Sequence, residues 1–266
     1  MSNCAFNYSG SKSDYHELHA ITEPVIDLFG GGGGWWSHVA SEIIYVNDVN
    51  SELIRFQRVV YSSTDEQFET LITKLYEITS AVDSRESYEA LRTRFNASKN
   101  PLLFMAVLSC CTNNMIRYNM SGGFNQTWGQ RKFNKNMEKK LREFRERIHY
   151  KKIFFQSESF INYEKIDNAL FLIDPPYIIS GNTYGIWNEH HENSLYAWMK
   201  DVRFVMTNYI RRGALTNDIL SNAITVNNWS TAELRVGKMR AQKDDSSFIE
   251  LIVCDSAETL SMFNLL

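Results

Sequence analysis

The four residues from Asp174 to Tyr177 bring together groups that could do chemistry. They follow the apolar run 169–173, which predicts a buried strand leading into a turn. Two prolines between Asp174 and Tyr177 fix the backbone, so a carboxylate, a peptide carbonyl and an aromatic ring are presented together. The first two accept hydrogen bonds and the ring can stack on a flat heterocycle. This set suits the exocyclic amine of a nucleobase, and the alternative is an ordinary proline-rich turn.

A second candidate site begins where the apolar strand 24–29 runs into five glycines, Gly30 to Gly34. Glycine lets the backbone turn tightly and approach a ligand closely, and a helix is expected beyond it. The next predicted strand, 43–46, leads to Asp48, which lies 21 positions after Asp27. This order and spacing is typical of doubly wound folds that hold a ribose by its hydroxyls. Because the glycines form a run and not GxGxxG, a nucleoside cofactor fits better than a dinucleotide.

Length and composition predict a globular α/β protein. The chain has 266 residues, 44% of them hydrophobic, and only four prolines, enough for one large α/β domain carrying an insertion. No apolar stretch reaches membrane-spanning length and the N-terminus is polar, so we expect a soluble cytoplasmic protein. The four cysteines lack metal-ligand spacing, and adjacent His190 and His191 point apart, so we expect reduced thiols and no metal.

The middle of the chain has a helical sequence pattern, whereas its two ends have strand patterns. Apolar residues recur at helical spacing between 51 and 152, and Pro101 is placed to open a helix. Strands are predicted again at 153–160, 202–206, 224–226 and 247–253. The chain therefore reads as an α/β sheet domain interrupted by a helical insert.

The end of this insert is the candidate DNA-binding part. Residues 113–131 combine amides, arginines and aromatics broken by glycines, and residues 131–152 contain ten Lys or Arg against three Glu. A solvated helix face is the ordinary explanation of such a run, but its contrast with a net charge of −3 favours phosphate contacts. Arg117 and Arg131 could read a guanine edge. Asn113, Asn119, Asn125 and Gln130 could contact other base edges, and Lys135, Lys139 and Lys140 could hold phosphates.

Taken in order, these motifs resemble those of the Dam-type DNA adenine-N6 methyltransferases, the D12 class with a DPPY motif. The segments 8–12, 27–31, 47–48 and 158–160 are similar to the family's cofactor elements, although Ser159 stands where many members have Asp. The resemblance implies a Rossmann-like fold that binds S-adenosylmethionine. It assigns cofactor contacts to Tyr8, Lys12, Asp27, Phe29, Gly31, Asp48, Ser159, Phe160 and Asp174, and catalysis to Asp174, Pro175 and Tyr177.

The resemblance also implies a domain plan and a reaction. Residues 1–54 and 153–266 would form the cofactor-binding catalytic domain, and residues 55–152 a helical target-recognition domain. The expected reaction is methyl transfer from S-adenosylmethionine to N6 of an adenine flipped out of double-stranded DNA, within GATC, by a monomer or weak dimer. The enzyme could act alone or beside a restriction nuclease.

Three other readings remain open at the level of sequence. A methyltransferase acting on RNA adenine or a protein glutamine could use a related tetrad, although such proteins usually carry Asn in place of Asp174. A non-catalytic DNA-binding decoy of the same fold would not need Asp174, Asp48 and Lys12. A dinucleotide oxidoreductase is disfavoured because GxGxxG is absent.

Overall fold

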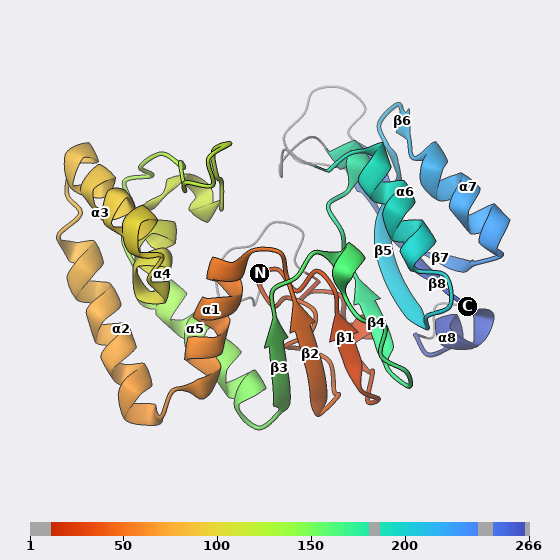
Figure 1. The fold of residues 1–266 in the computed structure, drawn as a ribbon, viewed down its shortest axis with the longest axis horizontal. Coiled ribbons are helices and arrows are strands. Elements are labelled where there is room, and N and C mark those ends of the chain that lie inside the picture. The colour runs from red at the N-terminus through yellow and green to blue at the C-terminus, as the bar shows by residue number, and fades with distance from the viewer. Residues whose placement is uncertain (1–11, 181–186, 239–246, 264–266) are drawn as a thin grey trace. The chain divides into compact units, whose positions relative to one another are not determined.

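The chain divides into two compact units in a computed structural model that describes residues 12–180, 187–238 and 247–263 (Figure 1). The helical unit comprises Met1–His16, Gly30–His38 and Asp48–Ser157. The sheet unit comprises Glu17–Phe29, Val39–Asn47 and Glu158–Leu266. Each unit is thus assembled from separate stretches of sequence. The assignment of DNA recognition to residues 55–152, and of cofactor binding and catalysis to the rest of the chain, stays a prediction.

Parallel strands form one half of the sheet unit. Strand β1 (Val25–Asp27) lies between β2 (Ile43–Asn47) and β4 (Leu170–Ile173), and β4 pairs in turn with β5 (Phe204–Arg212), all in parallel. All residues of β1 and β4 are buried, as expected for strands covered on both faces. Because neighbouring parallel strands end at the same edge, the last residues of β1, β2 and β4 lie there.

Antiparallel strands form the other half. Strand β8 (Ser247–Cys254) lies between β5 and β7 (Ser230–Lys238), and the short β6 (Leu215–Thr216) pairs with the end of β5. The mixed α/β class expected from the sequence is therefore confirmed. The short 3-10 helices of this unit are η3 (Phe160–Asn162) and η4 (Ile178–Ser180), and η1 (His16–His19) begins one residue before the unit does.

Helices α6 (Glu189–Trp198), α7 (Asp218–Asn227) and α8 (Ala257–Ser261) complete the sheet unit (Figure 1). Residues of α6 and α7 share one apolar core with the strands. The strand predicted at 224–226 is wrong, because this segment lies in α7. The side chain of Asn217 caps that helix, and Leu220 and Ala223 are buried at helical spacing while Val226 is exposed.

The helical unit is built around helix α4 (Pro101–Cys110), whose residues from Phe104 onward are all buried. Such a helix, apolar on every side, requires neighbours all around it. It contacts α1 (Ser51–Ser62), α2 (Asp65–Ser80) and α3 (Arg85–Ser98). The unit also contains η2 (Thr112–Asn114), α5 (Lys135–His149) and β3 (Lys152–Gln156). No helix in the described ranges is both long and apolar enough to cross a bilayer.

The glycine run does not lead into a helix as expected. Residues 31–40 form turns and bends, and the first α-helix begins only at Ser51, after β2. Gly31 and Gly33 have positive φ angles of 47° and 79°, which break helical geometry. Gly33 also lies against Phe144 and Trp36, whose rings pack edge to face at 5.4 Å. The run therefore serves close packing as well as turning.

We predict that Gly33→Ala destabilises the protein by more than Gly122→Ala. Both glycines have positive φ, so both alanines cost about 1–2 kcal/mol of backbone strain. At Gly33 the new methyl would lie 2.7 Å from the Phe144 ring, whereas at Gly122 nothing lies within 4 Å. Overpacking should therefore add about 1–3 kcal/mol at Gly33 alone. Urea unfolding measures both variants, and equal losses would contradict the packing argument.

Candidate active site

The amide of Asn47 joins the ends of β1 and β2 to the segment that carries Ser159 and Phe160. Its Nδ2 donates to the carbonyls of Leu28 and Glu158 at 3.1 and 3.0 Å, and its Oδ1 accepts the Glu158 N–H at 2.9 Å. The side chain is 1% exposed, so these bonds replace water at every position they use. Asn47 thus fixes the frame of this end of the sheet.

The carboxylate of Asp48 organises a turn in the helical unit. Its Oδ2 accepts the Gly31 N–H at 2.9 Å and its Oδ1 accepts the Asn50 N–H at 2.8 Å. Gln57 holds the same turn by donating to the Gly31 carbonyl at 2.7 Å. Burial raises the pKa of Asp48 above its ordinary value, and the two backbone bonds oppose that rise. A carboxylate has about four acceptor positions, so capacity remains for two hydroxyl groups.

The hydroxyl of Tyr177 connects three strands of the sheet unit. Its oxygen lies 2.8 Å from Oδ1 of Asp174, after β4, and 2.7 Å from Oε1 of Glu250, on β8. Thr207, on β5, lies 3.1 Å from the same oxygen and donates to Oδ1 of Asp174 at 2.9 Å. The structure thus brings two of the predicted catalytic residues, Asp174 and Tyr177, into direct contact. It adds Thr207 and Glu250, which the motif alone did not indicate.

The surroundings of Tyr177 keep its ring fixed and its hydroxyl neutral. The ring packs edge to face on Tyr209 at 4.7 Å. Burial, and then the charges of Asp174 and Glu250, raise the pKa of the Tyr177 hydroxyl well above its ordinary range. The hydroxyl therefore keeps its proton and acts as a hydrogen-bond donor at neutral pH.

Three aromatic rings form a cluster beside the cofactor motif in the sheet unit. Phe29 and Phe160, both predicted cofactor contacts, lie 5.7 Å apart, and Trp187 lies 5.7 Å from each. The indole Nε1 of Trp187 is buried without a hydrogen-bond partner among the described residues. A buried orphan donor beside flat rings suits a polar heterocycle. Sequence reasoning missed Trp187, since no motif marks it.

Asp27 and Ser159 adjoin Phe29 and Phe160 of that cluster, whereas Lys12 belongs to the helical unit. Asp27 ends β1, and its Oδ1 accepts the Phe29 N–H at 3.2 Å. Ser159 precedes η3 and makes no capping bond with its side chain. Lys12 is 2% exposed and lies over the Tyr15 ring at 5.8 Å. Tyr8 lies outside the described residues.

The predicted DNA-reading segment forms an irregular antiparallel loop, with bridges between Cys111 and Trp128 and between Tyr118 and Phe124. Arg117 is exposed and binds Asn125 through two hydrogen bonds of 2.9 Å. Asn119 uses its Oδ1 to accept two backbone N–H groups of the turn at 121–123. Asn113 and Gln130 are exposed with positive φ, and Arg131 contacts Asn114 at 3.3 Å. Their assignment to base edges stays a prediction.

The basic run divides into two groups along α5. Arg142 binds Glu69 and Glu138, and Arg145 pairs with Asp65 of α2 at 2.9 Å, so these arginines attach one helix to another. The predicted phosphate-binding residues differ in exposure and local pairing. Lys135 and Lys139 are exposed and pair with neighbouring glutamates of their own helix, and Lys140 is half-buried. The charge excess of +7 therefore overstates the cations that face solvent.

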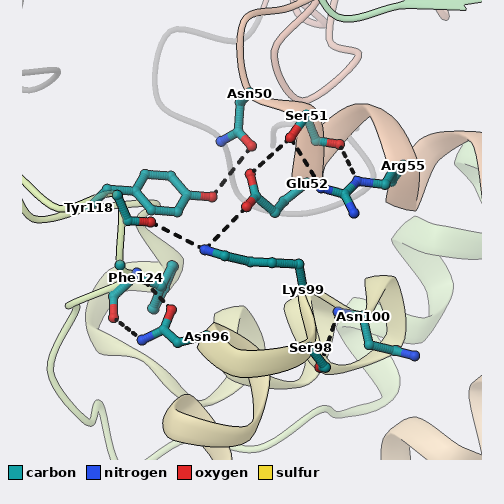
Figure 2. A network of polar contacts seen from close by, with 12 residues as sticks. Asn50, Ser51, Glu52, Arg55, Asn96, Ser98, Lys99, Asn100, Tyr118 and Phe124 are labelled. Atoms are coloured by element: carbon teal, nitrogen blue, oxygen red, sulfur yellow. Dashed lines mark hydrogen bonds and ion pairs between the residues drawn. The ribbon is translucent and has the colours of Figure 1, made fainter.

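Lys99 connects the predicted DNA-reading segment, residues 113–131, to helix α1 (Figure 2). The Nζ of Lys99 lies 3.3 Å from Oε1 of Glu52 and donates to the Gly122 carbonyl at 3.2 Å. The Tyr118 hydroxyl contacts Oδ1 of Asn50, the cap of α1, at 3.4 Å. The loop is thus bonded to the first turn of α1, whose cap Asn50 lies two residues after Asp48.

Among the described residues, no group of three or more His, Cys, Asp or Glu could hold a metal ion. Cys110, Cys111 and Cys254 are buried free thiols. The carboxylates, hydroxyls and aromatic rings described above lie at or beside the ends of strands in an α/β fold, a place where such folds often bind ligands.

The chain belongs to the D12 class N6 adenine-specific DNA methyltransferase family, whose model matches residues 9–241. This family uses S-adenosylmethionine as its methyl donor.

Several relatives with assigned names are similar to the chain at low identity. The Type II methyltransferase M.FokI of Planomicrobium okeanokoites is 26% identical over 240 residues, which is 80% of this chain and 37% of the relative. The modification methylase StsI of Streptococcus sanguinis is 24% identical over 241 residues, 81% of this chain and again 37% of the relative. A DNA adenine methylase of Salmonella typhimurium is 27% identical over 210 residues, 77% of this chain and 70% of the relative. The chain thus spans little more than a third of the first two relatives.

Proposed function

We propose that this protein transfers a methyl group from S-adenosylmethionine to N6 of an adenine flipped out of duplex DNA, acting as a site-specific adenine methyltransferase of the Dam type. One observation carries the proposal beyond family membership. The Asp174 carboxylate accepts the Thr207 hydroxyl at the end of β4 and lies beside the Tyr177 oxygen, one residue before Pro175. A carboxylate and the peptide carbonyl of the next residue offer two acceptors for the two N–H bonds of an exocyclic amine.

The residues present fit the cofactor. The partly buried Asp48 carboxylate retains capacity for two hydroxyls, which suits a ribose, and the rings of Phe29, Phe160 and Trp187 with an orphan indole N–H suit an adenine. Asp27, Gly31 and Ser159 complete this set by resemblance, together with Lys12 and Tyr8. When bound, S-adenosylmethionine supplies an electrophilic methyl group on its sulfonium.

The protein's own groups prepare the amine for attack. The lone pair of adenine N6 is delocalised into the ring, so the nitrogen is a poor nucleophile. By accepting both N–H groups, Asp174 and the Pro175 carbonyl draw it toward a tetrahedral shape with an available lone pair. The same acceptors face the positive charge that develops on nitrogen during transfer, which stabilises the transition state. Tyr177, with its hydroxyl anchored, stacks on the base and helps offset the few kcal/mol that flipping costs.

In this proposal, DNA recognition belongs to residues 113–131 and to helix α5 of the helical unit. Arg117 and Arg131 read guanine edges with the help of Asn113, Asn119, Asn125 and Gln130, and Lys135, Lys139 and Lys140 hold phosphates. By resemblance, the target is GATC in double-stranded DNA. The proposal includes action as a monomer or weak dimer in the cytoplasm.

Removal of the Asp174 carboxylate tests the mechanism. Asp174→Ala should slow methyl transfer by at least about 100-fold, because a lost transition-state acceptor costs about 3 kcal/mol or more. Its affinity for S-adenosylmethionine should stay within about tenfold, since the carboxylate acts mainly on the base. Asp167→Ala, an exposed aspartate before the same strand, is the matched control. The assigned mechanism is wrong if Asp174→Ala keeps more than about a tenth of the wild-type rate.

Asp48 gives a prediction with a pH dependence. Asp48→Ala should weaken S-adenosylmethionine binding by about 1.5–3 kcal/mol, the loss of charged hydrogen bonds. Because burial raises the pKa of Asp48, its carboxylate protonates at a higher pH than an exposed aspartate. Protonation removes acceptor capacity, so wild-type affinity should fall as the pH is lowered from neutral, and the variant should change less. Calorimetry over that range measures both, and parallel pH curves would remove Asp48 from the site.

The reader and anchor assignments predict different defects. Arg117→Ala should relax sequence choice at one base pair, whereas Lys139→Ala should weaken binding to all DNA and flatten its salt dependence. Methylation of oligonucleotides with GATC and each single-base variant measures this. Equal transfer to all of them by the wild type would reject GATC as the target. Uniform weakening by Arg117→Ala would move that residue to the phosphate contacts.

A further inference from the structure

Two carboxylates compete for one proton in the sheet unit. The Tyr177 oxygen lies within hydrogen-bond distance of both Asp174 and Glu250, at 2.8 and 2.7 Å. A phenol carries a single proton and can donate it to only one acceptor at a time. The partner that takes this proton therefore decides how strongly the other carboxylate can bind a further donor.

Glu250 is placed unlike an ordinary charged residue. It is 3% exposed in the middle of β8, between Ile249 and Leu251, where burying a carboxylate costs free energy. In the strand register, Tyr209 of β5 and Arg235 of β7 lie opposite it, and the bulges of both pairings begin at this point. The Tyr177 hydroxyl reaches it from the segment after β4. A buried acid at this position is expensive, which points to a role at the site that Tyr177 joins.

We propose that Glu250 is a positioning residue for methyl transfer, which draws the Tyr177 hydroxyl proton to itself and so keeps Asp174 available for the target amine. The inference rests on the proposed function. Oδ1 of Asp174 already accepts the Thr207 hydroxyl at 2.9 Å. A second donor on that oxygen would withdraw charge from the carboxylate and weaken its hydrogen bond to the amine. With the tyrosine proton on Glu250, Asp174 keeps this acceptor strength.

The substitution Glu250→Gln shifts that competition while it conserves shape. Tyr177 would then face a neutral amide on one side and a charged carboxylate on the other. Hydrogen bonds to ionised acceptors are roughly twice as strong as neutral ones, so the proton would move to Asp174. Addition of Tyr177→Phe removes the contested proton, so this donor no longer weakens the Asp174 carboxylate as an acceptor.

The sheet unit offers a matched control. Glu192 is 0% exposed and its Oε1 accepts the Tyr196 hydroxyl at 2.6 Å, with the amides of Asn208 and Asn217 on the same oxygen. This pair has the same chemistry, a buried glutamate bonded to a tyrosine, without contact to Asp174. Glu192→Gln therefore reports the general effect of neutralising a buried glutamate in this unit.

The experiment measures single-turnover methyl transfer to GATC duplex at saturating S-adenosylmethionine and DNA, together with cofactor affinity and unfolding by urea. Glu250→Gln should slow transfer by about tenfold, a coupling of about 1.4 kcal/mol, with cofactor affinity nearly unchanged. The double variant Glu250→Gln, Tyr177→Phe should transfer faster than Glu250→Gln alone. Glu250→Asp, which keeps a carboxylate, should lie between wild type and Glu250→Gln. Glu192→Gln should transfer at the wild-type rate.

Rescue by Tyr177→Phe is an outcome that a merely structural glutamate would not give. The inference is overturned if Glu250→Gln transfers like wild type, if it mainly loses cofactor affinity, or if the double variant is as slow as the single one. Should Glu250→Gln fail to fold, Glu250→Asp decides, since a rate no lower than wild type's would contradict the proposal. Absence of adenine methylation by wild-type protein would instead reject the proposed function itself.

Discussion

The parallel pairing of β1 with β2 and β4 is the constraint on which the candidate site depends. The register sets Asp27 beside Val46 and Leu172, so the three strands end together. Side chains that follow them must lie at one edge, whatever their separation in sequence. The buried amide of Asn47 makes this edge rigid, because it bonds to the backbone after β1 and to the segment before Phe160. Residues that are over a hundred positions apart, such as Asn47 and Glu158, are thereby brought into contact.

The antiparallel half of the sheet has a related task. Strands β5 and β8 bring Thr207 and Glu250 to the hydroxyl of Tyr177. The geometry of residues 174–177 is thus fixed by groups from two further strands. Two rigid prolines position the backbone of Asp174, but they do not set the direction of its carboxylate. That direction comes from the Thr207 hydroxyl, which donates to Oδ1 at 2.9 Å, with the Tyr177 oxygen beside it at 2.8 Å. Preorganised acceptors of this kind avoid reorganisation during the reaction.

Sequence reasoning found what local patterns encode. Apolar runs that end in Asp27 and Asp174 predicted buried strands and their motif residues, and helical periodicity placed α1, α2 and α4. It failed where a helix cap or a backbone conformation, which apolar patterns do not show, decides the structure. The apolar segment 224–226 has strand-like residues, but a cap at Asn217 makes it helical, and positive φ angles at Gly31 and Gly33 prevent the helix expected there. Glu250 was detectable only as a charge within an apolar strand, and Trp187 carried no signal.

In the helical unit, the start of α1 links the irregular loop that contains Tyr118 to the turn that Asp48 holds. Asp48 holds the Asn50 N–H, and the Asn50 side chain caps α1 while it contacts the Tyr118 hydroxyl. Lys99 adds an ion pair to Glu52 in the first turn of the same helix and a bond to the loop at Gly122 (Figure 2). The backbone that orients the acidic side chain thus also supports Tyr118, while Asn96 of α3 holds the bridge partner of Tyr118 by bonding the N–H and the carbonyl of Phe124. A displacement of either element must stretch bonds that the other one shares, which makes the start of α1 the mechanical connection between them.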